Sequence, residues 1–502
     1  MLFNSYLFIL FFLPITLLGY FTLNRYAYGK NGLAGIIWLF LMSLWFYGYQ
    51  KPEYLILILG SILVNFLIGF SLSELKRRGG KKGWQKLTVT IGVVFNLGLL
   101  VYFKYADFFL DAILERLFHF EYYVGVALPL GISFFTFQQI SYIVDCYRKE
   151  DGLHYGFFEY AAYVTFFPQL VAGPIVMHSE LVPQLMEKRN KRISWQNMSR
   201  GLYGFALGLG KKVILADTLS KLVSLGFSDI YVLNSASTLV VMLAYTLQIY
   251  FDFSGYCDMA LGIGYMFNVK LPINFNSPYK AGSISEFWER WHMTLTRFFT
   301  QYVYIPLGGS RNGRFRTYLN TMIVFLLSGF WHGANYTFLL WGGLHGAFMI
   351  VEKIGKDLGI RVSDGKLGKL LRLLYGGLTF FFVNLAWLLF RADRIRDWQC
   401  ILGSLFSGEW ELGEKFMEAM NKLIEVRLLA NLGLRGVFQS YPWLPLVTVL
   451  IVLLSAVFLM KNTQEKMEEE KYSFRRSIIT ILLLVWCIIS LSDVSEFLYF
   501  NF

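Results

Sequence analysis

Two histidines in one apolar stretch are the strongest candidates for chemistry in this sequence. His332 and His345 lie within residues 328–346, SGFWHGANYTFLLWGGLHG, a segment apolar enough to enter a membrane. An ionisable side chain at membrane depth costs free energy and usually marks a functional site. The alternative is that both rings only hydrogen-bond to neighbouring helices.

The spacing of the two histidines bears on whether they share a site. On one continuous α-helix, thirteen positions at about 100° each place the rings roughly 140° apart. Gly333, Asn335 and the pair Gly342 and Gly343 are positions where a helix could break. We therefore expect a shared site only if the chain bends at one of them.

Other polar side chains also lie inside apolar or aromatic segments. Asp252 and Asp258 lie among aromatic residues in the segment 248–258, where they could orient an imidazole or anchor helices. His292 lies beside a stripe of tryptophans and could either pack or take part in a site. The candidate supporting and channel residues are Trp331, Asp252, Asp258, Gln138, Gln139, His292 and Trp341.

Composition identifies a membrane protein. Of 502 residues, 56% are hydrophobic and 18% aromatic, and the mean hydropathy is +0.48. A soluble domain of this composition would lack a polar surface. The net charge of +12 therefore suggests a basic cytoplasmic face against anionic lipid rather than nucleic-acid binding. Neither the four cysteines nor the six histidines show metal-ligand spacing, so we expect no metal.

Apolar runs predict a chain that crosses the membrane many times. The loop 76–86, KRRGGKKGWQK, carries six positive charges in eleven residues. The positive-inside rule makes this loop cytoplasmic and places the N-terminus outside. The predicted spans are 3–23, 33–49, 53–75, 87–109, 201–225, 236–267, 370–391, 441–460 and 476–497.

Several segments depart from simple spans. Residues 128–139 and 166–174 are apolar but interrupted by proline, glycine and amides, which favours broken or re-entrant helices, with a kinked ordinary span as the alternative. Residues 285–299 predict one aromatic amphipathic helix at the interface, with Ser285 as its N-cap. Residues 395–437 mix charge with amphipathic runs and predict a peripheral insertion.

The basic loop before the histidine segment gives an estimate of depth. From Arg316 to His332 is sixteen residues, or roughly 24 Å of helix rise. A hydrocarbon core is about 30 Å thick, so we expect the imidazole of His332 beyond the midplane, toward the outer side.

In these motifs the chain resembles the membrane-bound O-acyltransferases, in particular their alginate O-acetyltransferase-like bacterial branch. The similarity covers most of the chain, from the opening residues 3–6 to the aromatic tail 497–502. Each motif is weakly specific, but their joint order is highly specific. The motifs between those ends are LPLGISFFTFQQISYIVD (128–145), FFPQLVAGPI (166–175), YFDFSGYCDMALGIG (250–264), LPINFNSPY (271–279), SEFWERWHMTLTRFF (285–299) and WHGANYTFLLWGGLHG (331–346).

The resemblance implies an all-α polytopic fold. It consists of a ring of about 10–12 transmembrane helices around a tilted central group with re-entrant and interfacial helices. One integral membrane domain would span 1–502, with N-terminal spans in 1–110, a catalytic core in 121–350 and C-terminal spans in 351–502.

The resemblance also implies a function. The family's catalytic histidine matches His332, and an acyl group passes from a cytoplasmic thioester to an extracytoplasmic acceptor. For the alginate-like branch this implies acetyl-CoA as donor, no bound cofactor, a polysaccharide acceptor and a secreted acetyltransferase partner. The alternatives are D-alanyl transfer from a carrier protein to a cell-wall polymer, a transporter whose buried histidines and acids relay protons, and a non-catalytic scaffold that recruits the secreted transferase.

The residues suit acyl transfer. An imidazole is neutral enough at pH 7 to take a proton from an attacking hydroxyl group, so we expect His332 to be the general base or a transient acyl acceptor. His345, Asn335 or a backbone amide near Gly333 could orient it or stabilise an oxyanion. The basic loop residues could bind the phosphates of coenzyme A, although a plain positive-inside loop also explains them. These residues are Arg311, Arg314 and Arg316.

Overall fold

The structure is a computed structural model that describes residues 1–26, 33–110, 125, 127–149, 154–359, 366–468, 473–493 and 498. Within these ranges the secondary structure is helical, and the strand-like pairing consists of an isolated antiparallel bridge between Phe275 and Trp291. The predicted all-α class is therefore confirmed. Of the aromatic tail 497–502, only Leu498 lies among the described residues.

Among the described helices, five are long and apolar enough to cross a membrane, and a sixth candidate is bent. The bent candidate joins Glu425–Ser440 to Leu444–Leu459 at 108°, as in a re-entrant segment. Together they confirm a multi-pass membrane protein, whereas the side on which each terminus lies stays a prediction. The five helices are Phe8–Tyr26, Tyr54–Arg77, Lys82–Leu110, Ser235–Met266 and Gly368–Arg391.

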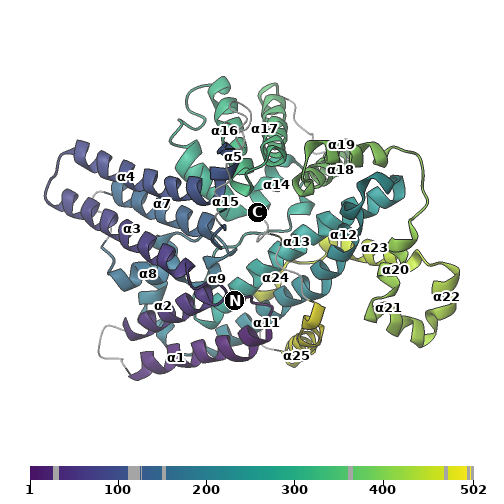
Figure 1. Ribbon diagram of the computed structural model, residues 1–502, viewed down its shortest axis with the longest axis horizontal. Helices are drawn as coiled ribbons and strands as arrows, with labels where there is room; N and C mark the ends of the chain where they lie inside the picture. The colour runs from purple at the N-terminus through teal and green to yellow at the C-terminus, as the bar shows by residue number, and fades with distance from the viewer. Residues whose placement is uncertain are drawn as a thin grey trace. The chain divides into compact units, whose positions relative to one another are not determined.

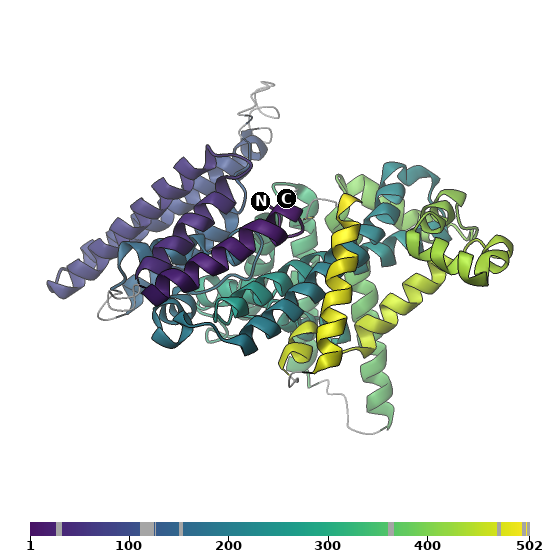
Figure 2. The ribbon, with the colours of Figure 1, turned by 90° about the horizontal axis from the view of Figure 1, so that it is seen from below.

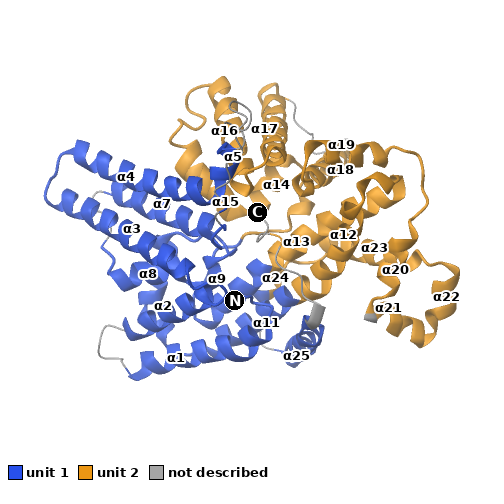
Figure 3. Ribbon diagram, in the orientation of Figure 1, with its two compact units in different colours: residues 1–209, 256–273, 467–491 blue, residues 210–255, 274–466, 492–502 orange. Residues whose placement is uncertain are grey.

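The chain divides into two compact units, coloured separately in Figure 3. Unit 1 comprises residues 1–209, 256–273 and 467–491, and unit 2 comprises residues 210–255, 274–466 and 492–502. Helix α13 (Ser235–Met266) contributes residues to both. The sequence-based subdivision near residues 110 and 350 stays a prediction.

Unit 1 is built around α3, α4 and α7, which lie alongside one another in both ribbon views (Figure 1, Figure 2). Two side-chain amides form a hydrogen bond inside this apolar group of helices: Asn65 Nδ2 donates to Asn96 Oδ1 across 3.2 Å. The principal helices of unit 1 are α1 (Leu13–Tyr26), α2 (Leu33–Gly48), α3 (Tyr54–Arg77), α4 (Lys82–Leu100), α5 (Ala106–Leu110), α7 (Ile132–Arg148), α8 (Phe157–Thr165), α9 (Phe167–Leu170), α10 (His178–Met186), α11 (Trp195–Gly210) and α25 (Phe474–Ile489).

The two interrupted segments of unit 1 differ in structure. The segment 166–174 is broken, because α8 ends at Thr165 and α9 spans only four residues before a loop leads to α10. The segment 128–139 instead turns once, at Gly131, and then continues as the unbroken α7. Gly131 has φ +71°, and a Cβ there would lie 2.5 Å from the Leu170 carbonyl oxygen, so only glycine fits this turn.

Unit 2 contains most of the C-terminal half of the chain, together with the segment that begins at Gly210 and includes α12. The predicted insertion 395–437 forms four short helices, α19 to α22, consistent with its amphipathic pattern. The principal helices of unit 2 are α12 (Asp217–Ser228), α14 (Ile284–Arg290), α15 (Met293–Phe299), α16 (Arg314–His332), α17 (Tyr336–Asp357), α18 (Lys366–Arg391), α19 (Ile395–Leu405), α20 (Glu414–Asn421), α21 (Ile424–Leu429), α22 (Arg435–Ser440) and α23 (Leu444–Leu459), with α24 (Thr463–Glu468) at its boundary.

The prediction of one amphipathic helix over 285–299 is wrong. The segment forms α14 and α15 with a break at His292, whose φ is +45°. The break occurs because the preceding connector pairs with it: Met293 N donates to the Asn274 carbonyl, and the Asn274 side chain accepts from Thr294 N. The N-cap is Ser283, two residues before the predicted Ser285.

Candidate active site

The histidine segment folds into a helical hairpin made of α16 and α17, which stand side by side in Figure 1. Helix α16 ends at His332 and α17 begins at Tyr336, so the helix breaks between them. Asn335 caps α17, since its Oδ1 accepts from Thr337 N across 3.1 Å, while its Nδ2 donates to the Asp393 carbonyl across 2.9 Å. Of the candidate break points, the chain uses the region from Gly333 to Asn335.

Glycines let the two helices of the hairpin approach through their backbones. A Cβ on Gly329 would lie 2.2 Å from the Phe338 carbonyl oxygen, and one on Gly342 would lie 2.3 Å from the Phe325 carbonyl oxygen. Gly342 therefore does not break α17; its missing side chain permits close packing, as small residues do between membrane helices.

The hairpin brings both histidines onto one indole. His332 is 4% exposed, and its ring centroid lies 5.3 Å from that of Trp341. His345 is fully buried, with its centroid 4.7 Å from the same indole. Phe390 closes the other side of His332 at 5.1 Å, and Trp331 contacts it at 4.9 Å. On one continuous helix the two rings would point roughly 140° apart. The turn between α16 and α17 instead brings both of them against Trp341.

A hydrogen bond defines the tautomer of His345. The Trp288 indole N–H on α14 can only donate, and it donates to His345 Nδ1 across 3.3 Å. Since Nδ1 accepts, a neutral His345 carries its proton on Nε2. Within the described part of the chain, neither His345 Nε2 nor Trp341 Nε1 has a hydrogen-bond partner. Two buried N–H donors therefore lie in the aromatic cluster around His332, and buried donors in proteins are normally satisfied.

Asp252 is held in a buried ion network of its own. Lys212 Nζ lies 2.6 Å from Asp252 Oδ1 and 2.9 Å from Asp217 Oδ1. The backbone N–H of Leu498, from the C-terminal tail, donates to the other Asp252 oxygen across 3.1 Å. These contacts favour the anchoring role of Asp252 over the orientation of an imidazole.

His292 lies at the break between α14 and α15 and is fully buried. Its Nδ1 lies 3.4 Å from Asn274 Oδ1, and its ring packs edge-on against Phe253. Its ring centroid is 6.0 Å from that of Trp331, whose indole also contacts His332. His292 and His332 therefore share Trp331 as a neighbour.

The remaining candidate supporting residues belong to a different unit from the histidine hairpin, which is part of unit 2. Gln138, Gln139 and Asp258 belong to unit 1, and Gln139 bonds there to Ser61 Oγ at 2.9 Å and to the Tyr160 hydroxyl at 3.3 Å.

The candidate donor-binding arginines lie in unit 2 at the start of α16. The side chains of Arg311, Arg314 and Arg316 are exposed. Arg314 and His332 are the two ends of this 19-residue helix, about 27 Å apart along its axis.

Sequence reasoning missed Trp288 and Lys212. Lys212 carried a usable signal, because a lysine within the apolar run 201–225 is an intramembrane charge like those that singled out the aspartates. The contact of Trp288 with His345 carried none, since it joins residues 57 positions apart.

Comparison with known proteins agrees with the motifs. The profile of the membrane-bound O-acyltransferase family matches residues 36–358. A peptidoglycan O-acetyltransferase of Helicobacter pylori is 38% identical over 100% of this chain and 98% of the relative. A probable alginate O-acetylase of Pseudomonas putida is 34% identical over the full length of both. A teichoic acid D-alanyltransferase of Bacillus subtilis is 26% identical over 44% of this chain and 58% of the relative. The chain belongs to the membrane-bound O-acyltransferase family.

Proposed function

We propose that this protein passes an acetyl group from a cytoplasmic thioester, acetyl-CoA, across the membrane for O-acetylation of a cell-envelope polysaccharide. The relatives that match over the whole chain are named as O-acetyltransferases of peptidoglycan or alginate. The D-alanyl alternative has less support, because that relative matches over less than half of the chain.

The observation that carries the proposal is the hairpin site, in which the buried His332 and His345 rings both pack against the indole of Trp341. His332 acts as general base, taking the proton of the attacking hydroxyl group. A positioned base of this kind typically contributes about 10²–10⁴-fold in rate. A transient acyl-histidine is the alternative route through the same ring.

The two unpartnered donors supply the second requirement of acyl transfer. Attack on a thioester carbonyl places negative charge on its oxygen, and fixed N–H groups in a dry site stabilise that charge. Trp341 Nε1 and His345 Nε2 fill this role, and Trp288 keeps the proton of His345 on Nε2. The surrounding aromatic rings exclude water and so strengthen both interactions.

The same proposal includes a binding site for the acyl donor and a partner protein that receives the acetyl group. The phosphates of coenzyme A bind the exposed residues Arg311, Arg314 and Arg316 on the cytoplasmic side. Since one helix separates these arginines from His332, the acyl arm lies along α16. An extracytoplasmic acetyltransferase receives the acetyl group and delivers it to the glycan, and the N-terminus lies outside.

The test uses purified full-length protein in liposomes with acetyl-labelled coenzyme A. We expect wild type to release labelled acetyl groups from acetyl-CoA and His332→Ala to lose at least about 10²-fold in turnover. Lys422→Ala, at the exposed residue that follows α20, serves as the control with unchanged turnover.

Two results would contradict the proposal. One is full acyl turnover by a normally folded His332→Ala protein. The other is proton-coupled uptake of substrate without consumption of acetyl-CoA, which would identify a transporter.

A further inference from the structure

Unit 1 contains a cavity of ≈300 Å³ at the C-terminal end of α3, and none of the residues that line it is used for acyl transfer. Phe66 and Phe70 line its apolar side, and Ser73, Glu74 and Arg77 line its polar side. Tyr155, from the connection that precedes α8, lines it as well. A cavity with aromatic walls and a few charged groups at one edge suits a ligand with an apolar part and an ionic part.

The polar edge and the basic loop that follows α3 together carry net positive charge. Arg77 donates from Nε and Nη2 to the two oxygens of Glu74, both at 2.8 Å, and Arg78 pairs with the same carboxylate. These contacts use two of the five N–H donors of Arg77, whose side chain is 69% exposed. One carboxylate thus faces two guanidinium groups, and the loop 76–86 adds four lysines. This charge complements a phosphodiester.

The cavity lies at the end of a candidate membrane span, at the level expected for the lipid headgroups. Helix α3 is one of the five candidate spans, and its last turn carries Lys76 and Arg77. Cationic side chains at the end of a span lie at the level of the lipid headgroups. Leu67 and Phe70, 51% and 59% exposed, extend an apolar surface of α3 away from the polar edge. An acyl chain lying on this surface would place its headgroup at Arg77.

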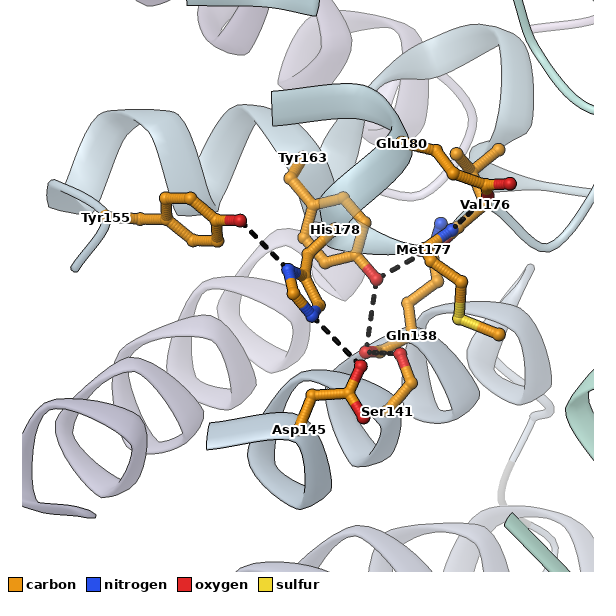
Figure 4. A network of polar contacts seen from close by, with 9 residues as sticks. All are labelled: Gln138, Ser141, Asp145, Tyr155, Tyr163, Val176, Met177, His178 and Glu180. Carbon is orange, nitrogen blue, oxygen red and sulfur yellow. Dashed lines mark hydrogen bonds and ion pairs between the residues drawn. The ribbon is translucent and has the colours of Figure 1, made fainter. Parts of the chain in front are cut away.

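A buried polar network holds Tyr155 in the wall of this cavity (Figure 4). His178 is fully buried at the start of α10; its Nδ1 lies 3.0 Å from the Tyr155 hydroxyl and its Nε2 lies 3.1 Å from Asp145 Oδ2 on α7. Burial, together with nearby Cys146 and Asp145, raises the pKa of Tyr155. The Asp145 carboxylate can only accept, so Nε2–H of a neutral His178 donates to it, and Nδ1 then accepts from the Tyr155 hydroxyl. The network therefore fastens this wall to two helices.

We propose that this pocket binds the headgroup phosphodiester of an anionic phospholipid, with the acyl chains along Phe66, Leu67 and Phe70 of α3. Arg77 supplies the N–H donors that contact the phosphate oxygens. Asp145, His178 and Tyr155 are positioning residues that keep the wall closed. The proposal is independent of the acyl-transfer chemistry.

The test measures lipid retention by native mass spectrometry of the purified, delipidated full chain. The protein is titrated with phosphatidylglycerol or phosphatidylcholine of identical acyl chains, and with soluble glycerol phosphate. We expect preferential retention of phosphatidylglycerol by wild type, lowered about fivefold in Arg77→Gln, the change expected for one cationic side chain at a lipid surface. Arg77→Lys keeps the charge and most of the retention.

The controls separate binding from folding. Arg77→Gln leaves Glu74 paired with Arg78, so it removes a donor without leaving a carboxylate unpaired. Lys422→Gln is the matched variant, because Lys422 is also 69% exposed and also paired with a glutamate one helical turn away; it should retain lipid as wild type does. Tyr155→Phe keeps the aromatic wall and should weaken retention only partly.

Three outcomes would overturn the proposal. They are equal retention of phosphatidylcholine and phosphatidylglycerol, wild-type retention by Arg77→Gln, and displacement of the lipid by stoichiometric glycerol phosphate, which would identify a soluble phosphate ligand.

Discussion

The indole N–H of Trp288 on α14 donates to Nδ1 of His345 on α17 across 3.3 Å. This single contact determines which nitrogen of a neutral His345 bears the proton. The sequence left the role of His345 undefined. Because of this contact, His345 presents an N–H donor within the aromatic cluster that contains His332.

Trp288→Phe should lower kcat roughly tenfold with little change in KM. The substitution keeps an aromatic ring against Trp341 and removes the N–H that fixes His345, a loss of about one hydrogen bond. Steady-state acetyl transfer with a thermal melt checks this. Trp291→Phe, an equal loss of volume at a neighbouring buried tryptophan, is the control. A fall in Tm without a fall in kcat would show that Trp288 only packs.

Trp341→Phe should lower kcat by about 10²–10³-fold, the usual cost of removing one oxyanion donor. A phenyl ring can still contact both His332 and His345, so KM and Tm should stay near wild type. The measurement is kcat and KM for acetyl-CoA. If this variant turns over like wild type, the indole N–H takes no part in the reaction.

Gly342→Ala should destabilise the hairpin by about 1–3 kcal/mol, because its new Cβ would lie 2.3 Å from the Phe325 carbonyl oxygen. Gly343→Ala is a matched control on the same helix, where the nearest atom to a Cβ is Leu326 Cδ2 at 3.7 Å. Thermal unfolding in detergent compares the two. Equal melting temperatures would mean that α16 and α17 do not rely on close backbone contact.

Asn335→Ala should cost about 1 kcal/mol of stability through loss of the α17 N-cap. Asn335→Ser restores a capping oxygen and should recover most of that loss. Since Asn335 caps rather than contacts the reacting groups in this interpretation, kcat measured below the melting range should stay close to wild type in both variants. A large fall in the kcat of a fully stable Asn335→Ser protein would restore the direct catalytic role suggested by the sequence.

Lys212→Met should destabilise the protein by about 3–5 kcal/mol, because it removes the buried ammonium group that pairs with both Asp252 and Asp217. Adding Asp217→Asn and Asp252→Asn to the same chain should recover stability. Lys422→Met, which breaks an exposed pair, should change it by less than about 1 kcal/mol. Chemical denaturation in detergent measures all three. If the changes in unfolding free energy of the three substitutions simply add in the triple variant, the three side chains are not energetically coupled.

The sequence by itself determined the fold class and the membrane character, and it predicts the residue most suited to the chemistry. Long apolar runs and basic loops predict spans because lipid and lipid headgroups act on local composition. The broken segment 166–174 was visible through its proline and glycine. The Trp-His-Gly motif indicated His332 through its resemblance to the family, and Gly333 and Asn335 were among the positions where a helix break was expected. These are local properties, encoded in neighbouring residues.

Only the tertiary structure decided which of these residues meet. Trp288 and His345 are 57 positions apart, and Lys212 and Asp252 are 40 apart, so both pairings depend on how helices pack rather than on any local pattern. The break of 285–299 at His292 likewise comes from pairing with Asn274, which outweighs the helical propensity of the segment. Local chemistry placed the elements in a membrane, and packing through glycines brought His332 and His345 onto Trp341.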